Sequence, residues 1–465
     1  MNFQKLRNFL GLGFCTTACL FLPACHKSDS AKPNPSEVAP QSRLDWNLKT
    51  LVNAYQNAGY TNVKWDEPAE RALTEFARVR AHAIQTNEPW GQIISTNAVA
   101  AVQDGCDDPM VNYLYIKCAL AQTNSKEAFA KAFFKVSRDM QKSSYPSIRK
   151  FYTSLRAVQQ LYYAYGTNVD KAMLREADGA NGCYLLESLK DENMPFEEIY
   201  EACQEGIKAY QGTQNLSDEI EKALSKKWSN ESGFWLLKGQ AYTEKAWNAR
   251  GHEYAYKVTD KGWELFRDRL AIAEKALARA WELNPNDPRI ALQMITVELG
   301  QGQGRDYMEL WFKRAMMLDP NDYDACISKL FYLEPKWYGS RESMIEFGLE
   351  CVSNANWGGR VPLVLVDAHW NYCRGYIKKS EQGDYWKQAE VWQDIKSAFD
   401  RFFELNPDAV DYYRKYAWYA YHAEQWDKLN DLLTKLGPYD YDYFGGKAEF
   451  DKMVQLAKNH VSNPH

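Results

Sequence analysis

A short motif that ends one helix and starts another recurs in the second half of this 465-residue chain. Leucine, a polar residue, proline and two more polar residues stand at 283–287 and at 318–322, and a shortened copy stands at 405–408. The first two prolines are 35 residues apart. Because proline interrupts a helix and Asn or Asp caps the next one, this spacing predicts a repeated pair of helices.

The residues before the prolines indicate how the helices of a repeat pack. Small and large residues follow each other at helical spacing: Ala273, Leu277 and Ala280 before the first proline, Phe312 and Ala315 before the second. The pattern is similar to that of tetratricopeptide (TPR) repeats, which have 34 residues, and residues 235–242 resemble the first helix of such a unit except at Lys238. This resemblance implies stacked antiparallel helix pairs that bind a partner on a concave face.

The rest of the chain also has helical periodicity. Apolar residues recur at helical spacing from residue 44 onward, and alternating strand-like runs are nearly absent. We therefore predict an all-α fold in which antiparallel helix pairs stack as a TPR-like solenoid. We expect an N-terminal helical region at 44–228, repeats with insertions at 229–436 and a C-terminal segment at 437–465. Residues 235–350 also resemble an uncharacterised bacterial family of TPR-like proteins, which carries no assigned activity.

Two insertions interrupt the repeats. Residues 248–269 are rich in aromatic side chains where a TPR unit has only a short turn, and we expect them to lengthen the flanking helices. The second and third motif prolines are 87 residues apart, about 17 more than two regular units need. We place this excess near 337–340 and 357–360, as surface loops. Loops on a rigid scaffold are where binding residues tend to collect.

The N-terminus is expected to direct the chain to a membrane. Basic residues precede an apolar run at 9–22 that is too short to span a bilayer, which indicates a signal peptide at 1–24. The segment Leu22-Pro23-Ala24-Cys25 resembles the lipobox of bacterial lipoproteins. That resemblance implies acylation of Cys25, and His26 in place of aspartate favours the outer membrane, facing the periplasm. The alternative is an ordinary secreted protein cut near Ala24.

The residues after Cys25 are expected to form a tether. The segment 25–43 has three prolines and few large apolar residues, so it cannot bury enough surface to order itself. Seven more cysteines follow residue 100, without a C-x-x-C pair. Since their number is odd, we expect at least one free buried thiol. The sequence does not reveal which of the others pair.

The chain lacks recognisable catalytic or metal motifs. Residues 252–256 begin like the zinc motif H-E-x-x-H, but Tyr256 stands where the second histidine is needed. Asp367 and His369 are close in sequence, yet a hydrogen-bonded helix histidine is the simpler interpretation of His369. The net charge is −5 with both signs interspersed, which gives no nucleic-acid footprint. We therefore expect no catalysis, no cofactor, no metal and no nucleic-acid binding.

The sequence instead predicts a membrane-anchored scaffold that binds an unknown protein or peptide. Candidate binding residues fall into two groups: the loop residues Trp337, Tyr338, Trp357 and Arg360, and the first-helix residues Gln240, Thr243, Glu244 and Gln293. Aromatic residues make up 14% of the chain, and ring faces also bind sugars. A SusD-like glycan-binding outer-membrane lipoprotein is therefore one alternative, and an enzyme of unrecognised type is another.

Overall fold

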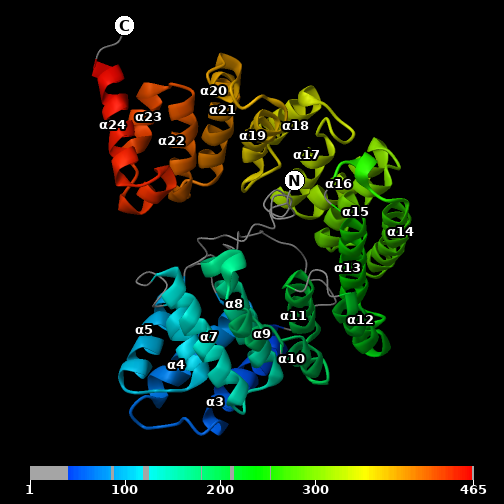
Figure 1. Cartoon of the computed structure of the whole chain (residues 1–465), viewed down its shortest axis with the longest axis vertical. Coiled ribbons are helices and arrows are strands. Elements are labelled where there is room, and N and C mark those ends of the chain that lie inside the picture. The colour runs from blue at the N-terminus through cyan, green and yellow to red at the C-terminus, as the bar shows by residue number, and fades with distance from the viewer. Residues whose placement is uncertain are drawn as a thin grey trace. The chain divides into compact units, whose positions relative to one another are not determined.

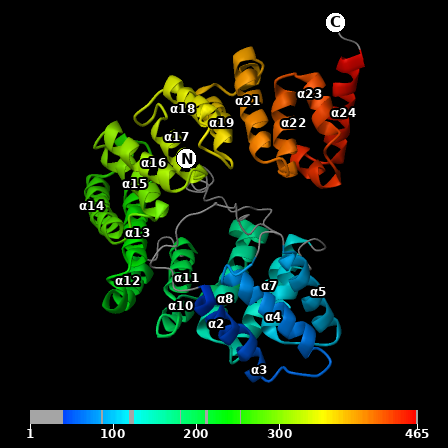
Figure 2. The ribbon, with the colours of Figure 1, turned by 180° about the vertical axis from the view of Figure 1, so that it is seen from behind.

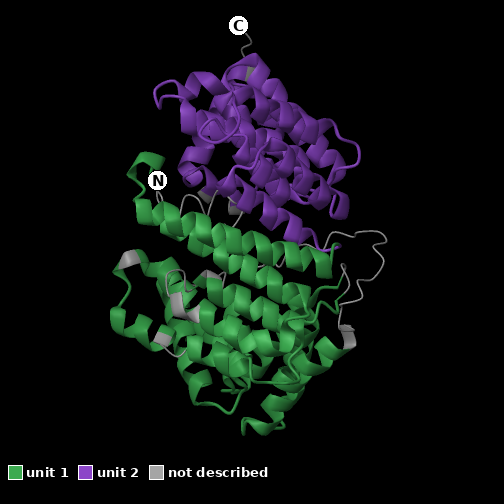
Figure 3. Ribbon diagram, turned by 90° about the vertical axis from the view of Figure 1, so that its right-hand side faces the viewer, with its two compact units in different colours: residues 1, 13–285 green, residues 2–12, 286–465 purple. Residues whose placement is uncertain are grey.

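A computed structural model of the chain describes residues 40–84, 88–118, 125–179, 181–209, 214–251 and 253–462. The regular elements of these ranges are helices, with no strand among them. The all-α prediction is therefore confirmed. The described residues form two compact units, which divide between Pro285 and Asn286 (Figure 3). Each unit is described by itself.

Unit 1 begins with consecutive helices that pack around one apolar core (Figure 1). Neighbouring helices pair with each other, α4 with α5 and α7 with α8. The core includes the fully buried side chains of Tyr55, Leu73, Phe133 and Leu161. The elements are α2 (Pro40–Leu48), η1 (Lys49–Asn53), α3 (Ala54–Asn57), α4 (Asp66–Arg80), α5 (Trp90–Gln103), α6 (Pro109–Cys118), α7 (Lys126–Lys142) and α8 (Ser147–Tyr165).

The second half of unit 1 ends in a long helical hairpin. Its elements are η3 (Gly166–Asn168), α9 (Lys171–Gly179), α10 (Asn181–Ser188), α11 (Phe196–Ala209), α12 (Gln214–Trp228), α13 (Ser232–Arg250), η4 (Ala255–Lys257) and α14 (Asp260–Leu283). In the α13–α14 hairpin, a Cβ atom added to Gly239 would lie 2.5 Å from Cγ of Leu277. The expectation that small residues let these helices approach therefore holds. The aromatic insertion lengthens both helices, as the sequence predicts.

Unit 2 continues the alternation of helices. Its elements are α15 (Pro288–Gln301), α16 (Arg305–Leu318), α17 (Tyr323–Tyr332), α18 (Arg341–Ser353), η5 (Val361–Leu363), α19 (Val364–Tyr376), α20 (Gln382–Trp386), α21 (Ala389–Leu405), η6 (Val410–Tyr412), α22 (Tyr413–His422), α23 (Trp426–Leu433), η7 (Pro438–Phe444) and α24 (Lys447–Ser462). Helices α22, α23 and α24 lie side by side in both views (Figures 1 and 2).

The recurring motif starts helices at its first two copies. The Asp287 carboxylate accepts a hydrogen bond of 3.0 Å from the backbone N–H of Arg289 at the start of α15. Asp322 accepts one of 2.8 Å from Ala325 in α17. The third copy differs, because its Asn406 side chain donates to the carbonyl of Gly359 at 2.8 Å and the 3₁₀ turn η6 follows.

The structure bears on three of the predicted segment boundaries. The ordered part begins no later than Pro40, because residues 40–43, assigned to the tether, lie in α2. The division between the compact units falls at Pro285, inside the predicted repeat region of 229–436. The C-terminal segment is also not separate from the repeats, since Phe450, Met453 and Ala457 of α24 are buried in the unit 2 core.

The opposite face of α24 is charged. Lys447 pairs with Asp451, and Lys452 pairs with Glu449, with more than half of each side chain exposed. These pairs each join residues three or four positions apart on one helix, so they lie on its solvent side. Helix α24 therefore has one apolar face toward the core and one charged face away from it.

The repeat packing predicts the effect of enlarging a contact residue. Ala315 in α16 is fully buried, so Ala315→Trp should lower the free energy of unfolding by about 1–3 kcal/mol through overpacking. The control is Lys313→Trp on the exposed side of the same helix, where a change below about 0.5 kcal/mol is expected. Denaturant titration followed by circular dichroism measures both. If neither Ala315→Trp nor the equivalent Ala280→Trp is destabilising, the proposed helix register is wrong.

Candidate functional site

The first predicted loop lies at the C-terminal end of α17. The Trp337 ring is half-buried and packs at 5.8 Å from the Phe331 ring, centroid to centroid. The Tyr338 ring packs at 4.6 Å from that of Tyr332 and is 46% exposed. Its hydroxyl donates to the carbonyl of Leu299 at 3.3 Å. Both aromatic residues therefore pack against α17, and Tyr338 also contacts α15.

The second predicted loop lies at the other end of α17. Trp357 packs edge-on against Phe312 at 5.8 Å, and the Arg360 guanidinium lies over the Tyr323 ring at 4.3 Å. Tyr323 is the first residue of α17 and Tyr332 is its last. A helix of this length is about 15 Å long. The structure therefore separates Trp337 and Tyr338 from Trp357 and Arg360 rather than forming one surface.

The glycines of these loops serve internal packing. A Cβ atom on Gly339 would lie 2.1 Å from the carbonyl oxygen of Leu333, and one on Gly358 would lie 2.4 Å from Oδ1 of Asn321. A glycine in a binding loop can leave room for the backbone of a partner. The close approach is instead made within this chain, so the loops fasten the two ends of α17.

The first-helix candidates are only partly accessible. Thr243 is 3% exposed and its hydroxyl donates to the Gly239 carbonyl at 2.8 Å, so the prediction that it faces a partner is wrong. Gln240 is half-buried and accepts a hydrogen bond of 3.3 Å from the Tyr200 hydroxyl in α11. Glu244 in α13 and Gln293 in α15 are half-buried. Gln293 belongs to unit 2 and the other three to unit 1.

His369 is held as a structural residue. It is 1% exposed, with Nδ1 at 2.7 Å from the Tyr385 hydroxyl and Nε2 at 3.0 Å from Oδ2 of Asp394. Its sequence neighbour Asp367 accepts a hydrogen bond from Tyr323 instead. The interpretation of His369 as a hydrogen-bonded helix histidine is therefore confirmed. The described residues contain no group of three or more His, Cys, Asp and Glu that suits a metal ion.

Most ring contacts lie between helices of one unit. The rings of Phe399 and Tyr416, for example, stack at 4.3 Å between α21 and α22. Tyr254 and Tyr256 are different, because 73% and 80% of their surfaces are exposed. Their rings are nearly parallel, with an interplanar angle of 7° and centroids 5.8 Å apart. They lie in the aromatic insertion, in the segment Glu253–Thr259, which we call the tyrosine loop.

The base of the tyrosine loop is braced on both sides. The Arg250 guanidinium donates to the carbonyls of Gly251 at 3.2 Å and Glu253 at 3.3 Å. It also lies 5.8 Å from the Trp247 ring and 5.5 Å from the Trp263 ring. Burial among these rings lowers the pKa of Arg250. The guanidinium therefore ties the end of α13 to the start of α14.

Further contacts hold the loop itself. The backbone N–H of Lys257 donates to the Tyr254 carbonyl at 2.8 Å, and its ammonium pairs with Glu253 at 3.1 Å. The Thr259 hydroxyl accepts a hydrogen bond of 3.0 Å from Gly262 and caps α14. These bonds fix the backbone on either side of both tyrosines. The two exposed rings therefore stand on a backbone that these contacts brace.

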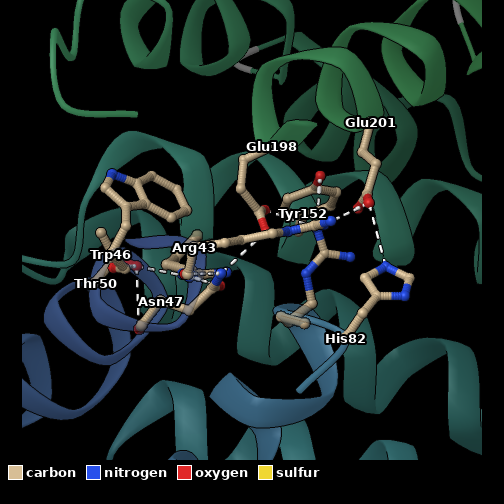
Figure 4. Close-up of polar contacts among 10 residues, drawn as sticks. Arg43, Trp46, Asn47, Thr50, His82, Tyr152, Glu198 and Glu201 are labelled. Carbon is tan, nitrogen blue, oxygen red and sulfur yellow. Dashed lines mark hydrogen bonds and ion pairs between the residues drawn. The ribbon is translucent and has the colours of Figure 1, made fainter. Parts of the chain in front are cut away.

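A second notable site fastens the first ordered helix to unit 1. In this buried ionic cluster, Arg43 of α2 and Arg80 of α4 both pair with Glu198 of α11, at 2.8 and 3.0 Å (Figure 4). Arg80 also pairs with Glu201 at 2.9 Å, and Arg43 pairs with the same carboxylate. The Glu198 side chain is fully buried. One turn of α11 thus connects two helices from the start of the chain.

A third arginine extends the cluster along α2. Arg149 of α8 is 2% exposed and donates to Asn47 at 2.7 Å and to Thr50 at 2.6 Å (Figure 4). Burial lowers the pKa of Arg149 to about 10. Asn47 in turn donates to Glu198 at 3.0 Å. Helix α2 and the η1 turn that follows it are therefore held by α8 and α11 through polar contacts, and α4 joins the cluster through Glu198.

The charges of the cluster compensate for its burial. Burial alone would raise the pKa of Glu201, but His82, Arg80 and Arg43 together lower it to about 2. Burial would also raise the pKa of Glu198, and the neighbouring Arg80 and Arg43 instead lower it. Both carboxylates therefore stay charged and paired over the physiological pH range. The sequence did not predict this ionic cluster, because Arg43 stands in a segment that was assigned to the tether.

A scan against protein-family models and a search of curated proteins each give no match. In the described part of the chain, no helix has the length and apolar character needed to cross a bilayer. Cys25, the predicted acylation site, lies outside the described residues.

The buried ionic cluster predicts a large effect for one substitution. Glu198→Gln should lower the free energy of unfolding by about 3–5 kcal/mol, because it removes the fully buried one of the two carboxylates that Arg43 and Arg80 share and leaves Glu201 alone to balance both arginines. The control is Glu187→Gln, which removes an exposed pair with Lys190 and should cost less than about 1 kcal/mol. Denaturant titration compares the two variants with the parent. Equal, small losses would mean that the cluster contributes no more than surface pairs do.

Proposed function

We propose that this chain is a lipid-anchored scaffold of the bacterial cell envelope and binds a protein partner through its tyrosine loop. The anchor is Cys25, at the end of the lipobox-like segment. The 14 residues between Cys25 and Pro40 can reach at most about 50 Å when fully extended. The body of the protein would thus stay close to the membrane while remaining free to reorient.

The buried ionic cluster suits such an anchored arrangement. Any pull on the tether reaches the body first through α2, a helix of nine residues. Helix α2 continues through η1 into α3 without leaving helical geometry, and a single helix of this kind gains most of its stability from packing against other elements. Its Arg43 and Asn47, together with Thr50 of η1, tie it to the longer helices α8 and α11. The first ordered helix is therefore suited to bear an anchor.

One observation carries the binding role, namely the rigid display of two exposed tyrosines. Tyrosine supplies a large amphipathic contact area with few rotatable bonds, so it loses little entropy on binding. Tyr254 and Tyr256 expose most of their surfaces and stand on a backbone that Arg250 and Lys257 brace. Since the loop is already ordered, a partner would not need to order it.

The glycan alternative rests on the same two rings. Nearly parallel ring faces also suit the apolar face of a sugar, and the Tyr hydroxyls and the Glu253–Lys257 pair offer hydrogen bonds. Mixed charges and hydroxyls around two aromatic anchors are equally the composition of a protein contact. The experiments below separate the two possibilities.

Site-specific crosslinking tests the proposed contact. With the photoreactive residue p-benzoylphenylalanine replacing Tyr256 in cells that make the full chain, irradiation should yield one discrete protein adduct. The same residue in place of Tyr162, which is 51% exposed in α8 of the same unit, is the control and should yield none. Adding Tyr254→Ala should weaken the adduct at position 256 at least several-fold, because it removes half of the aromatic contact.

Other outcomes would contradict the protein-binding role. Adducts of equal yield at positions 162 and 256 would indicate random collision rather than a binding surface. Absence of an adduct, combined with retardation of the parent in a polysaccharide gel and loss of that retardation in Tyr254→Ala/Tyr256→Ala, would favour the glycan alternative.

Metabolic labelling tests the anchor. Cys25→Ser should leave an uncut precursor that takes up no labelled fatty acid, because only the thiol of this position can be acylated. Cys106→Ser, which removes a buried thiol of the folded body, is the control and should label like the parent. Labelling of Cys25→Ser at the parent level would refute the anchor.

A further inference from the structure

Three neighbouring helices of unit 2 meet in matching layers of side chains. Lys329 of α17 lies between Phe312 of α16 and Phe347 of α18, with its ammonium 4.2 and 4.3 Å from the two ring centroids. The two rings are 5.4 Å apart. Short connections join α16 to α17 and α17 to α18, so α17 runs opposite to its two neighbours. This layer fixes the register of the three helices.

The next layer contains three sulfur atoms. Met316 lies one helical turn after Phe312 in α16, and Cys351 lies one turn after Phe347 in α18. Because α17 runs in the opposite direction, its residue in this layer is Cys326, one turn before Lys329. The Cys326 sulfur lies 3.6 Å from that of Met316, which confirms this register. Burial raises the pKa of the Cys326 thiol, and Cys351 also lies near enough to help raise it. Cys326 is fully buried and Cys351 is 1% exposed.

We propose that Cys326 and Cys351 form a disulfide bond, joining α17 to α18, when the chain folds in an oxidising compartment. Both thiols are free in the structure, which thus represents the reduced protein. Cys326 and Cys351 belong to the same layer of side chains and lie on adjacent helices. The bond would close the segment that contains the α17–α18 turn with Trp337 and Tyr338.

The reaction needs a disulfide-containing oxidant, written RS–SR. One cysteine thiolate attacks a sulfur of RS–SR, forms a mixed disulfide and releases one RS⁻, which takes up a proton. The second thiolate attacks the cysteine sulfur of the mixed disulfide and releases the other RS⁻. The two cysteines lose two electrons and two protons, and the oxidant becomes two molecules of RSH. Glutathione disulfide or a disulfide oxidoreductase fits this description.

Burial determines when this reaction takes place. Burial raises the pKa of the Cys326 thiol far above its usual range, and only the thiolate attacks a disulfide. The folded, reduced protein should therefore react slowly with an oxidant. During folding the same thiols are exposed, so the bond should form before the layer closes. The pairing consequently depends on the compartment in which the chain folds.

Refolding of residues 25–465, the chain that remains after removal of the predicted signal peptide, tests the proposal. The protein is unfolded with reductant and refolded with a mixture of reduced and oxidised glutathione, or with reductant alone. Free thiols are then alkylated in denaturant, and the digest is analysed by mass spectrometry. We expect a linked pair of peptides containing Cys326 and Cys351 in more than half of the molecules refolded with glutathione, and none with reductant.

Matched variants and a kinetic comparison complete the test. Cys351→Ser should abolish the linked peptides, and Cys203→Ser, which alters an equally buried cysteine of unit 1, should leave their yield unchanged. The folded, reduced protein should form the bond at least ten times more slowly than the refolding chain. The bonded form should also melt at a higher temperature than the reduced form.

Two results would overturn the proposal. One is refolded protein with a native circular-dichroism spectrum in which both cysteines are alkylated despite the glutathione mixture. The other is a bonded form that melts below the reduced form, because that would show that the bond strains the helix pair rather than joining neighbours.

Discussion

Close approach of antiparallel helices is the constraint on which both compact units depend. In unit 1 the α13–α14 hairpin closes because Gly239 leaves space for Leu277, and in unit 2 a Cβ atom at Gly348 of α18 would lie only 2.8 Å from the Leu365 backbone of α19. Small residues at such points bring whole helix faces into van der Waals contact. The large residues beside them then fill the remaining space. The stacking of the helices and the formation of the apolar core depend on small residues such as Gly239 and Gly348.

The buried ionic cluster solves a different problem, namely how to attach a short terminal helix. Apolar packing holds the longer helices, but α2 has only nine residues. Charged groups taken out of water cost free energy unless each finds a partner. Arg43, Arg80 and Glu198 satisfy one another across three helices. Because any one of them alone would be unfavourable inside the protein, their pairing adds to the apolar contacts of Leu44, Trp46 and Leu48 that also hold α2.

Local signals in the sequence predicted most of the fold. The periodicity of apolar residues predicted the helices, and the proline motifs predicted where α15 and α17 begin. The aromatic run at 248–269 predicted that helices α13 and α14 are long. Contacts between distant residues were not predictable. Arg43 and Glu198 are 155 positions apart, and no local pattern pairs them. The separation of Trp337 from Trp357 likewise depends on which end of α17 each loop meets, which only the packing determines.

The two faces of α24 have a consequence for how the protein associates with itself. A stack of helix pairs has an apolar surface at each end, onto which another copy can add in the same direction without limit. In unit 2, α24 turns Phe450 and Met453 inward and leaves the pairs of Lys447 and Lys452 outward. Its solvated charges make this end a poor template for further stacking. The helix therefore terminates the stack at this end of unit 2 and disfavours the growth of open-ended filaments.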